Sequence, residues 1–303
     1  MIKDFAALER LAREKTVDPL LVAFVEPHEP KLIQAIDRAM KHRLVKPVLI
    51  GDEASILKAG NEAGIEVRGW ELVRSPDANY SAYQALELIR DNKVGGIGKG
   101  VFGVKDFLSL LFERRLGFRV AKNLVTGIAV FKSDKVDRLL LASDPVVNPQ
   151  PEMMDLVDIV NNAVVVARKL GNPLPKVAML AAVEVIYPQM PVTIVGAVIA
   201  KMVDKGQIKN CLVDGPLSMD VAIVEEAAKE KGAKGEVAGK ADLLIGPNLA
   251  TSYGVYKALT MYTRSDVGVL LTGGKVPAVV TSAYDTVDTK YNSLVLTTIA
   301  AAK

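Results

Sequence analysis

Polar residues follow the short apolar runs of this sequence, at positions where they could bind a ligand. The runs are rich in Val, Leu and Ile and end in Gly, Pro, Asp, Asn or Ser. If these runs are strands of an open sheet, ligands bind just beyond their carboxyl ends. The rule selects Lys99, Asp144, Asn148, Asp214, Asn248, and the group of Thr281, Ser282 and Asp285.

The segment "GKGVFG", residues 98–103, offers one cation and several backbone N–H groups at a strand-to-helix turn. It matches the G-x-G-x-x-G pattern of dinucleotide sites, but Phe102 falls within the turn and the next acid, Asp134, lies beyond the usual spacing. It is not a P-loop, because Gly100 follows Lys99 where Ser or Thr is needed. The turn suits an anion, and a packing turn with a solvated lysine is the alternative.

The segment "LVDGPLSMDVAI", residues 212–223, is predicted to form a strand, a turn and a helix. Asp214 would end the strand, directly before Gly215 and Pro216. An acid at a strand mouth is placed to face a ligand, whereas Asp-Gly is also a common turn former. Both interpretations of Asp214 are open on the residues alone.

The composition argues against several classes of function. The 38 basic and 35 acidic residues are dispersed, so no basic stripe is expected for a nucleic acid. His28 and His42 are the only histidines and no G-x-S-x-G elbow is present, so we expect neither a metal site nor a Ser-His-Asp hydrolase. With Cys211 alone, the chain forms no intramolecular disulfide.

We expect no membrane segment and no signal peptide. The most apolar window, residues 177–200, is interrupted by Glu184, Pro188 and Pro191, whereas a span needs about 20 apolar residues in a row. The N-terminal segment is charged and amphipathic, without the apolar core of a signal peptide. The expected location is therefore the cytoplasm.

Strand-like runs alternate with helix-like segments almost from end to end. For example, the run "DPLLVAFVEP", residues 18–27, precedes the helical pattern "PKLIQAIDRAMKHR", residues 30–43. This alternation predicts an α/β fold with mainly parallel sheets, and strands that are apolar throughout predict helices on both faces. The Pro-rich "DPVVNPQPE", residues 144–152, is a candidate domain joint.

Six segments of the sequence are more informative together than any single motif. They are "GQIKNCLVDGPLSMDVAI" (206–223), "EVAGKADLLIGPNLATSYGVYKALT" (236–260) and "PAVVTSAYDTVDTKYNSLVL" (277–296), with support from "GKGV" (98–101), "LGFRVAKNLVTGIAVF" (116–131) and "IVNNAVVVARKLG" (159–171). In this order they resemble the phosphate acetyltransferase and phosphate butyryltransferase family, and the butyryl branch more closely. The resemblance covers the chain nearly end to end, so it is more specific than any glycine motif.

The resemblance implies a fold and an activity. The fold would be two α/β domains with mainly parallel sheets and a cleft between them, as in isocitrate and isopropylmalate dehydrogenases. We expect residues 1–130 plus 270–303 in the first domain and 131–269 in the second. The activity would be transfer of a short-chain or branched acyl group between coenzyme A and inorganic phosphate, giving an acyl phosphate. Coenzyme A would be a substrate, with no tightly bound cofactor or metal, and the chain would form a homodimer or higher homo-oligomer.

Carried over to this sequence, the resemblance assigns residues to the cleft. Ser282 would donate to phosphate or to the acyl oxygen, and Lys99 or Arg119 would neutralise the phosphate. Asp214 and Asp285 would polarise substrate groups or handle protons. The remaining residues of the implied site are Gly100, Gly215, Pro216, Asn248 and Thr281.

One position departs from the family pattern. The serine that matches Ser282 is normally followed by an arginine that clamps phosphate, and Ala283 stands there in this chain. Lys275, Lys290 or Arg119 could supply the missing charge, or the acyl substrate could differ. Alternatively, the protein could bind CoA or an acyl phosphate without efficient turnover. A dehydrogenase, based on "GKGVFG" alone, is the third hypothesis.

Overall fold

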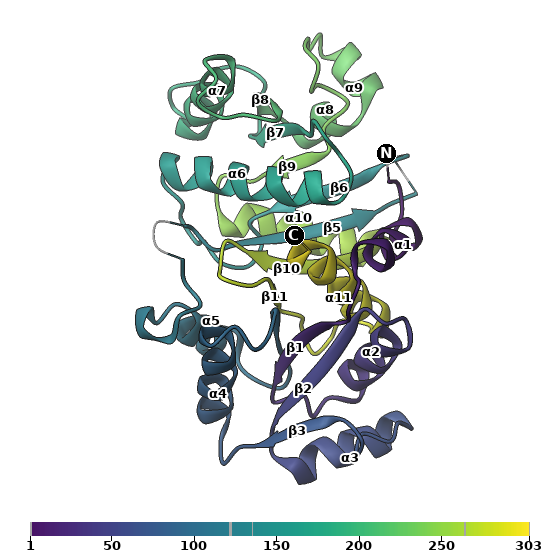
Figure 1. Ribbon diagram of the computed structural model, residues 1–303. Helices are drawn as coiled ribbons and strands as arrows, with labels where there is room; N and C mark the ends of the chain where they lie inside the picture. The colour runs from purple at the N-terminus through teal and green to yellow at the C-terminus, as the bar shows by residue number, and fades with distance from the viewer. Residues whose placement is uncertain (1, 121–122, 135, 264, 303) are drawn as a thin grey trace. The chain divides into compact units, whose positions relative to one another are not determined.

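The computed structural model describes residues 2–120, 123–134, 136–263 and 265–302 (Figure 1). Contacts group these residues into two compact units. Unit 1 comprises the chain up to Asp4 together with Thr126–Asp266, and unit 2 comprises Phe5–Val125 together with the chain from Val267 onward. Each unit combines strands with covering helices, so the predicted α/β class is confirmed.

Unit 2 contains a mainly parallel sheet with the strand order β3-β2-β1-β4-β11-β10. Its strands are β1 (Leu20–Val25), β2 (Val45–Gly51), β3 (Glu71–Arg74), β4 (Gly96–Lys99), β10 (Asp266–Thr272) and β11 (Ala278–Val279). The neighbours from β3 to β11 are parallel, and β10 pairs antiparallel with β11. The carboxyl ends of β1, β4 and β11 therefore meet at one edge of this sheet.

Helices lie on both sides of the unit 2 sheet, as the apolar strands predict (Figure 1). One layer holds α1 (Phe5–Lys15), α2 (Pro30–Lys41), α3 (Glu53–Ala63) and α11 (Val287–Ala301), in which α11 contacts both α1 and α2, and α2 contacts α3. The other side holds α4 (Ala78–Arg90) and α5 (Val104–Leu111), followed by the short 3-10 turn Arg114–Leu116.

The helix α11 is buried along most of its length, from Lys290 to Ile299. Its polar side chains are hydrogen-bonded, as burial requires. Asn292 donates to the carbonyl of Val267 at 3.2 Å, and the Ser293 hydroxyl accepts from the Val269 N–H at 2.9 Å. These bonds attach α11 to β10, so the C-terminal part of the chain is an internal element of unit 2.

Unit 1 contains sheet strands that pair in the order β5-β6-β9-β7-β8. Its strands are β5 (Thr126–Lys132), β6 (Leu139–Ser143), β7 (Lys176–Leu180), β8 (Leu212–Leu217) and β9 (Leu243–Ile245). Only β5 and β6 pair antiparallel among these neighbours, and the others are parallel. The helices are α6 (Met153–Lys169), α7 (Pro191–Asp204), α8 (Met219–Ile223), α9 (Glu225–Glu230) and α10 (Leu249–Tyr262). In Figure 1, α6 lies in front of this sheet and α10 behind it.

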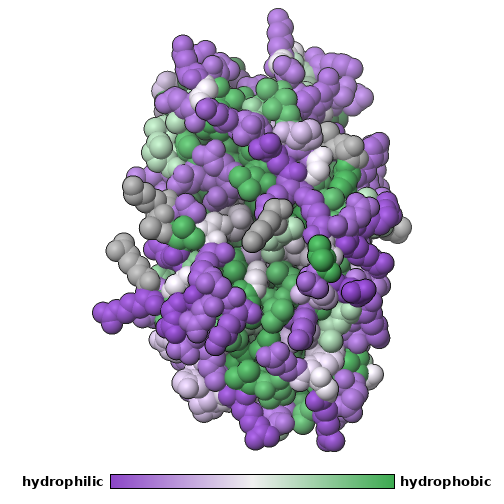
Figure 2. Space-filling model, in the orientation of Figure 1, coloured by the Kyte–Doolittle hydropathy of each residue, from purple (hydrophilic) through white to green (hydrophobic). Residues whose placement is uncertain are grey.

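The most apolar window of the sequence, residues 177–200, is divided between β7, a loop and α7. Among the described residues, no helix is long and apolar enough to cross a membrane. Figure 2 shows hydrophilic residues spread over the face that it draws, with hydrophobic patches between them.

The expected domain ranges, 1–130 plus 270–303 and 131–269, remain a prediction. The compact units change over at Val125 and Thr126, and again at Asp266 and Val267, within a few residues of those ranges. They differ at the N-terminus, because the first residues group with unit 1. There Ile2 packs near Gly171, and Lys3 forms an ion pair with Asp137.

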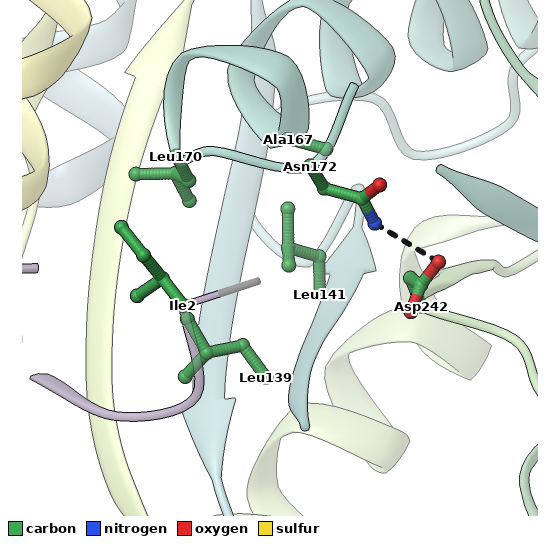
Figure 3. Close-up of a pocket in the computed structure, with 7 residues that line it drawn as sticks. All are labelled: Ile2, Leu139, Leu141, Ala167, Leu170, Asn172 and Asp242. Carbon is green, nitrogen blue, oxygen red and sulfur yellow. Dashed lines mark hydrogen bonds between the residues drawn. The ribbon is translucent and has the colours of Figure 1, made fainter. Parts of the chain in front are cut away.

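A buried carboxylate fixes the amino-terminal edge of the unit 1 sheet. Asp242 precedes β9, and its Oδ2 accepts from Asn172 Nδ2 and from the backbone N–H of Lys176, both at 3.0 Å. The Arg138 guanidinium lies 3.9 Å from its other oxygen. Figure 3 shows Asp242 beside a small, mainly apolar cavity of about 20 Å³, which has room for about one water molecule. This edge is opposite to the one where α/β sheets bind ligands, so we assign Asp242 a structural role.

We expect Asp242→Ala to lower the free energy of unfolding by about 1–3 kcal/mol, because it leaves two partly buried donors without their acceptor. Urea unfolding followed by circular dichroism measures the change. Asp242→Asn is the matched variant, since it keeps one acceptor oxygen and loses less stability. Equal stability of Asp242→Ala and the unmodified protein would contradict the structural role.

Candidate active site

The carboxyl-terminal edge of the unit 2 sheet gathers polar residues from three neighbouring strands. Glu26 and Glu29 follow β1, Lys99 and Gly100 end β4, and the Thr281–Asp285 turn follows β11. Continuing the register of Ala278 with Ile97 and Val279 with Gly98 brings Thr281 level with Gly100. Lys290 joins them from the first turns of α11. We call Glu29, Lys99, Thr281, Ser282, Asp285 and Lys290 the lysine cluster.

Gly100 allows the close approach of β4 to β1 at this edge. Its N–H donates to the carbonyl of Val25 at 2.7 Å, and the next N–H, of Val101, donates to the carbonyl of Glu26 at 2.8 Å. A Cβ atom on Gly100 would lie only 2.0 Å from the Glu26 carbonyl oxygen, where no atom fits. A glycine is therefore required beside Lys99 for steric reasons, whatever ligand binds here.

Lys99 is a buried lysine with 6 % relative exposure. Its Nζ donates to the carbonyl of Gly100 at 2.9 Å. Burial lowers its pKa below the ordinary value, and the nearby ammonium group of Lys290 lowers the pKa further, while Glu29 and Asp285 oppose this shift. A buried cation with carboxylates close by is a suitable partner for an anionic substrate group, as the sequence predicts for Lys99.

The Thr281–Asp285 turn presents Ser282 to solvent. Asp285 closes the turn, because its Oδ2 accepts from the Ser282 N–H at 2.8 Å and its own N–H donates to the Ser282 carbonyl at 3.1 Å. The Ser282 hydroxyl accepts weakly from the N–H of Tyr284 at 3.3 Å, which leaves its proton available to a ligand. Ala283 and Tyr284 are exposed. The carboxylate of Asp285 thus has a structural partner, which favours turn formation over proton transfer.

Lys290 is the main residue that the sequence analysis underrated. It is 1 % exposed, and its Nζ lies 3.1 Å from Glu29 Oε1, donates to the Ser282 carbonyl at 2.7 Å and donates to Thr281 Oγ1 at 3.3 Å. The sequence suggested Lys290 only as one source of missing charge and did not suggest Glu29. The available signals were a lysine near the start of the final helical segment and an acid directly before the proline that begins the helix after the first strand.

Glu26 was also missed, although it directly follows an apolar strand. It is 6 % exposed and has a positive φ of 50°. Its carboxylate accepts a hydrogen bond from the buried hydroxyl of Ser81 and lies 3.3 Å from His28 Nδ1. This group holds the β1–α2 segment, and with it the backbone oxygen that faces Gly100.

Arg119 does not contribute a described side-chain contact to the lysine cluster. Its side chain is exposed, and its backbone forms an isolated antiparallel bridge with Gly274. Lys275, next to that bridge, donates to the carbonyl of Arg90 at 2.8 Å. Of the three candidates for the missing charge, the structure thus joins only Lys290 to the Ser282 turn.

The other predicted residues lie in unit 1. Asp214 is half-buried, its Oδ1 accepts from the Gly215 N–H at 2.8 Å, and burial raises the pKa of its carboxyl group. Gly215 packs so closely that a Cβ there would lie 2.5 Å from Cβ of Met179. Asn248 is the N-cap of α10 and accepts from the Thr251 N–H at 2.9 Å. A capping role therefore already explains Asn248.

The predicted turn after Asp214 is wrong. Asp214, Gly215 and Pro216 lie within β8, which continues to Leu217. The strand can hold a proline because it is at the edge of the unit 1 order and its register with β7 shifts between Ala178 and Leu180.

Two strand-end residues named at the outset, Asp144 and Asn148, also meet in unit 1. The buried Asp144 follows β6, and its carboxylate accepts from the backbone N–H groups of Val146, Val147 and Asn148 at 2.8–3.1 Å and from the Asn148 amide. Burial raises the pKa of Asp144 despite these bonds. Asp144 therefore shapes the 144–148 loop, whose proline-rich sequence suggested a joint.

Comparison with known proteins identifies the family. Residues 77–298 match the family model described as phosphate acetyl/butaryl transferase. The chain is 40 % identical over 301 residues to a phosphate butyryltransferase of Clostridium acetobutylicum, covering 99 % of both proteins. The chain belongs to the phosphate acetyl/butyryl transferase family. It is therefore an acyltransferase.

Solved structures agree with the fold of this family. A branched-chain phosphotransacylase from Enterococcus faecalis superposes with a TM-score of 0.81 at 27 % identity, over 93 % of this chain and 99 % of that one. A putative 4-hydroxythreonine-4-phosphate dehydrogenase from Salmonella typhimurium, at 12 % identity and a TM-score of 0.51 over 93 % and 99 % of the two chains, shares the fold alone. The expected dehydrogenase-like architecture is thus confirmed. The comparisons give no support to a non-catalytic member of the family.

We expect Gly100→Ala to destabilise unit 2 by about 1–3 kcal/mol, because the new methyl group forces β4 away from Glu26. Urea unfolding measures the loss. Gly69→Ala is the control, since a Cβ there meets no atom within 4 Å. If both variants unfold at the same urea concentration, the close approach of Gly100 to Glu26 does not limit the stability of unit 2.

Proposed function

We propose that this protein transfers a short-chain or branched acyl group between coenzyme A and inorganic phosphate. The observation that carries the proposal is the lysine cluster, which puts a buried cation, Lys99, and an exposed hydroxyl, Ser282, at the ligand-binding edge of an α/β sheet. The full-length similarity to a phosphate butyryltransferase supports the same reaction.

The reaction makes one bond and breaks one. A phosphate oxygen attacks the thioester carbonyl carbon of the acyl-CoA, the carbonyl oxygen becomes negative, and the C–S bond breaks as the carbonyl re-forms. CoA leaves as the thiolate and takes up a proton. The site must hold two anions close together and stabilise the oxyanion, which calls for cations and hydroxyl donors. In this proposal Lys99 neutralises the phosphate, and Ser282 donates to the phosphate or to the acyl oxygen.

Further residues would line the substrates. In unit 2 these are Thr281, Gly100, Asp285 and Arg119, whose exposed guanidinium could reach an anionic ligand. Asp214, Gly215, Pro216 and Asn248 belong to unit 1, and only the family resemblance assigns them to substrate binding. Burial raises the pKa of Asp214, which suits the proton-handling role that the resemblance gives to this residue. Coenzyme A would be a substrate, and the chemistry requires neither a metal nor a tightly bound cofactor.

We also propose a cytoplasmic homodimer. Unit 1 exposes apolar side chains on α6, among them Met154 at 57 % and Val165 at 52 %, which supports contact with a second copy. The mass by light scattering at several protein concentrations tests this part of the proposal.

Removal of Ser282 or Lys99 tests the proposed roles. We expect Ser282→Ala and Lys99→Met each to lower kcat by about 100-fold or more, because each removes a donor or a charge that faces the developing negative charge. Free thiol release from butyryl-CoA in the presence of phosphate measures the rate. No thiol release by the unmodified protein with any acyl group of two to six carbons would overturn the proposed function.

The substitution Ala283→Arg tests whether the absence of the usual phosphate-binding arginine limits the reaction rate. Ala283 is exposed, so Ala283→Arg adds a side chain without a clash. Because Lys99 and Lys290 already supply two buried ammonium groups, we expect kcat/KM for phosphate to change by less than tenfold, which corresponds to less than about 1.4 kcal/mol. A hundredfold gain in kcat/KM for phosphate would show that the two lysines do not replace the missing arginine.

A further inference from the structure

Lys290 is buried more completely than its neighbour Lys99, so its role differs from that of a ligand-facing cation. It is 1 % exposed, and all three of its described partners are protein oxygens, from Glu29, Thr281 and Ser282. A buried ammonium group is stable only when such partners satisfy its three protons. These bonds leave little access for a substrate oxygen.

The partners of Lys290 come from three separate parts of unit 2. Glu29 precedes α2, Thr281 and Ser282 follow β11, and Lys290 itself lies on α11. The backbone carbonyl of Glu29 already caps α2 by accepting from the N–H groups of Leu32 and Ile33 at 3.0 Å, and its side chain makes no capping bond. Its carboxylate is therefore directed to Lys290, and not to the helix that it begins.

The hydrogen bond from Lys290 to the Ser282 carbonyl fixes the backbone of the Thr281–Asp285 turn. That carbonyl also accepts the N–H of Asp285, which closes the turn around Ala283 and Tyr284. The Ser282 side chain itself is exposed, and its one hydrogen bond within the described part of the chain is a weak one, accepted from the N–H of Tyr284 at 3.3 Å. The direction of the hydroxyl thus depends on the backbone that Lys290 holds.

We infer that Lys290 is a positioning residue: its salt bridge with Glu29 fixes the Thr281–Ser282 turn, and its ammonium group lies close to Lys99, where an anionic phosphate group binds. This inference rests on the proposed function. It extends that function by assigning to a buried pair the support that an arginine next to Ser282 would otherwise provide.

The electrostatic part of the inference predicts opposite effects for the two partners. The charged groups that face Lys99 are Lys290 on α11, Glu29 before α2 and Asp285 in the turn. The acid after β1, Glu26, is engaged with Ser81 and His28. Lys290 lowers the pKa of Lys99 and Glu29 raises it. Loss of Lys290 therefore raises the pKa of Lys99, whereas loss of the Glu29 charge lowers it.

The test compares Lys290→Met and Glu29→Gln, with Lys41→Met as the control. Lys41 is exposed and forms an ion pair with Asp37 at 2.6 Å, and neither residue belongs to the lysine cluster. We expect Lys290→Met to lower kcat/KM for phosphate by about 100-fold, as a small displacement of a reacting group can do, and the control to change it less than twofold. The alkaline limb of the pH–rate profile should move to higher pH in Lys290→Met and to lower pH in Glu29→Gln.

Side-chain NMR of Lys99 gives the same answer without turnover. Titration of its Cε resonances should show the two opposite shifts, even if the protein released no thiol from any acyl-CoA. If Lys290→Met does not fold, the downward shift of the Lys99 pKa in Glu29→Gln alone tests the inference. An active enzyme whose pH limb and Lys99 resonances stay in place in these variants would overturn the inference and leave the proposed function intact.

Discussion

The candidate site depends on the burial of a positive charge. An ammonium group removed from water is stable only beside oxygens that replace its hydration, and Lys290 finds them on Glu29, Thr281 and Ser282. Because these oxygens belong to segments far apart in the sequence, one side chain constrains the start of α2, the turn after β11 and the start of α11 together. Such a pair contributes little net stability compared with an apolar contact of the same size. Its value lies in the geometry that it specifies.

A second constraint is steric. The carbonyl of Glu26 faces the α-carbon of Gly100 so closely that no side chain fits, and this approach holds Lys99 against the end of β1. The carbonyl is itself held by a residue with a positive φ, whose carboxylate is bound by Ser81. The position of the reactive edge is thus set by backbone contacts, while its charge is set by side chains.

Much of this arrangement could be predicted from the sequence, because apolar strands and their end residues are local signals. The α/β class and the positions of Lys99 and Ser282 at strand ends follow from such runs. Glu29 and Lys290 could not be paired in this way, since they are 261 positions apart and nothing in the local sequence of either points to the other. Asp214 was misplaced because Gly-Pro after an acid usually ends a strand, and only the edge position and shifted register of β8 explain why the strand continues. Residue roles that come from the family resemblance alone, such as those of Arg119 and Asn248, stay predictions.

The chain order of the two units has a consequence for synthesis on the ribosome. Apart from its first few residues, unit 1 is one continuous stretch, Thr126–Asp266, whereas unit 2 needs β10, β11 and α11 from the chain that follows. Domains generally fold as units while the chain emerges, so unit 1 can become compact while unit 2 still lacks the strand beside β4 and the helix on α2. During that interval β4 has an open edge, and Glu29 lacks its buried counterion. The lysine cluster is therefore among the last parts of the protein to form. A nascent chain that is stalled before residue 290 would lack the residues that complete this cluster.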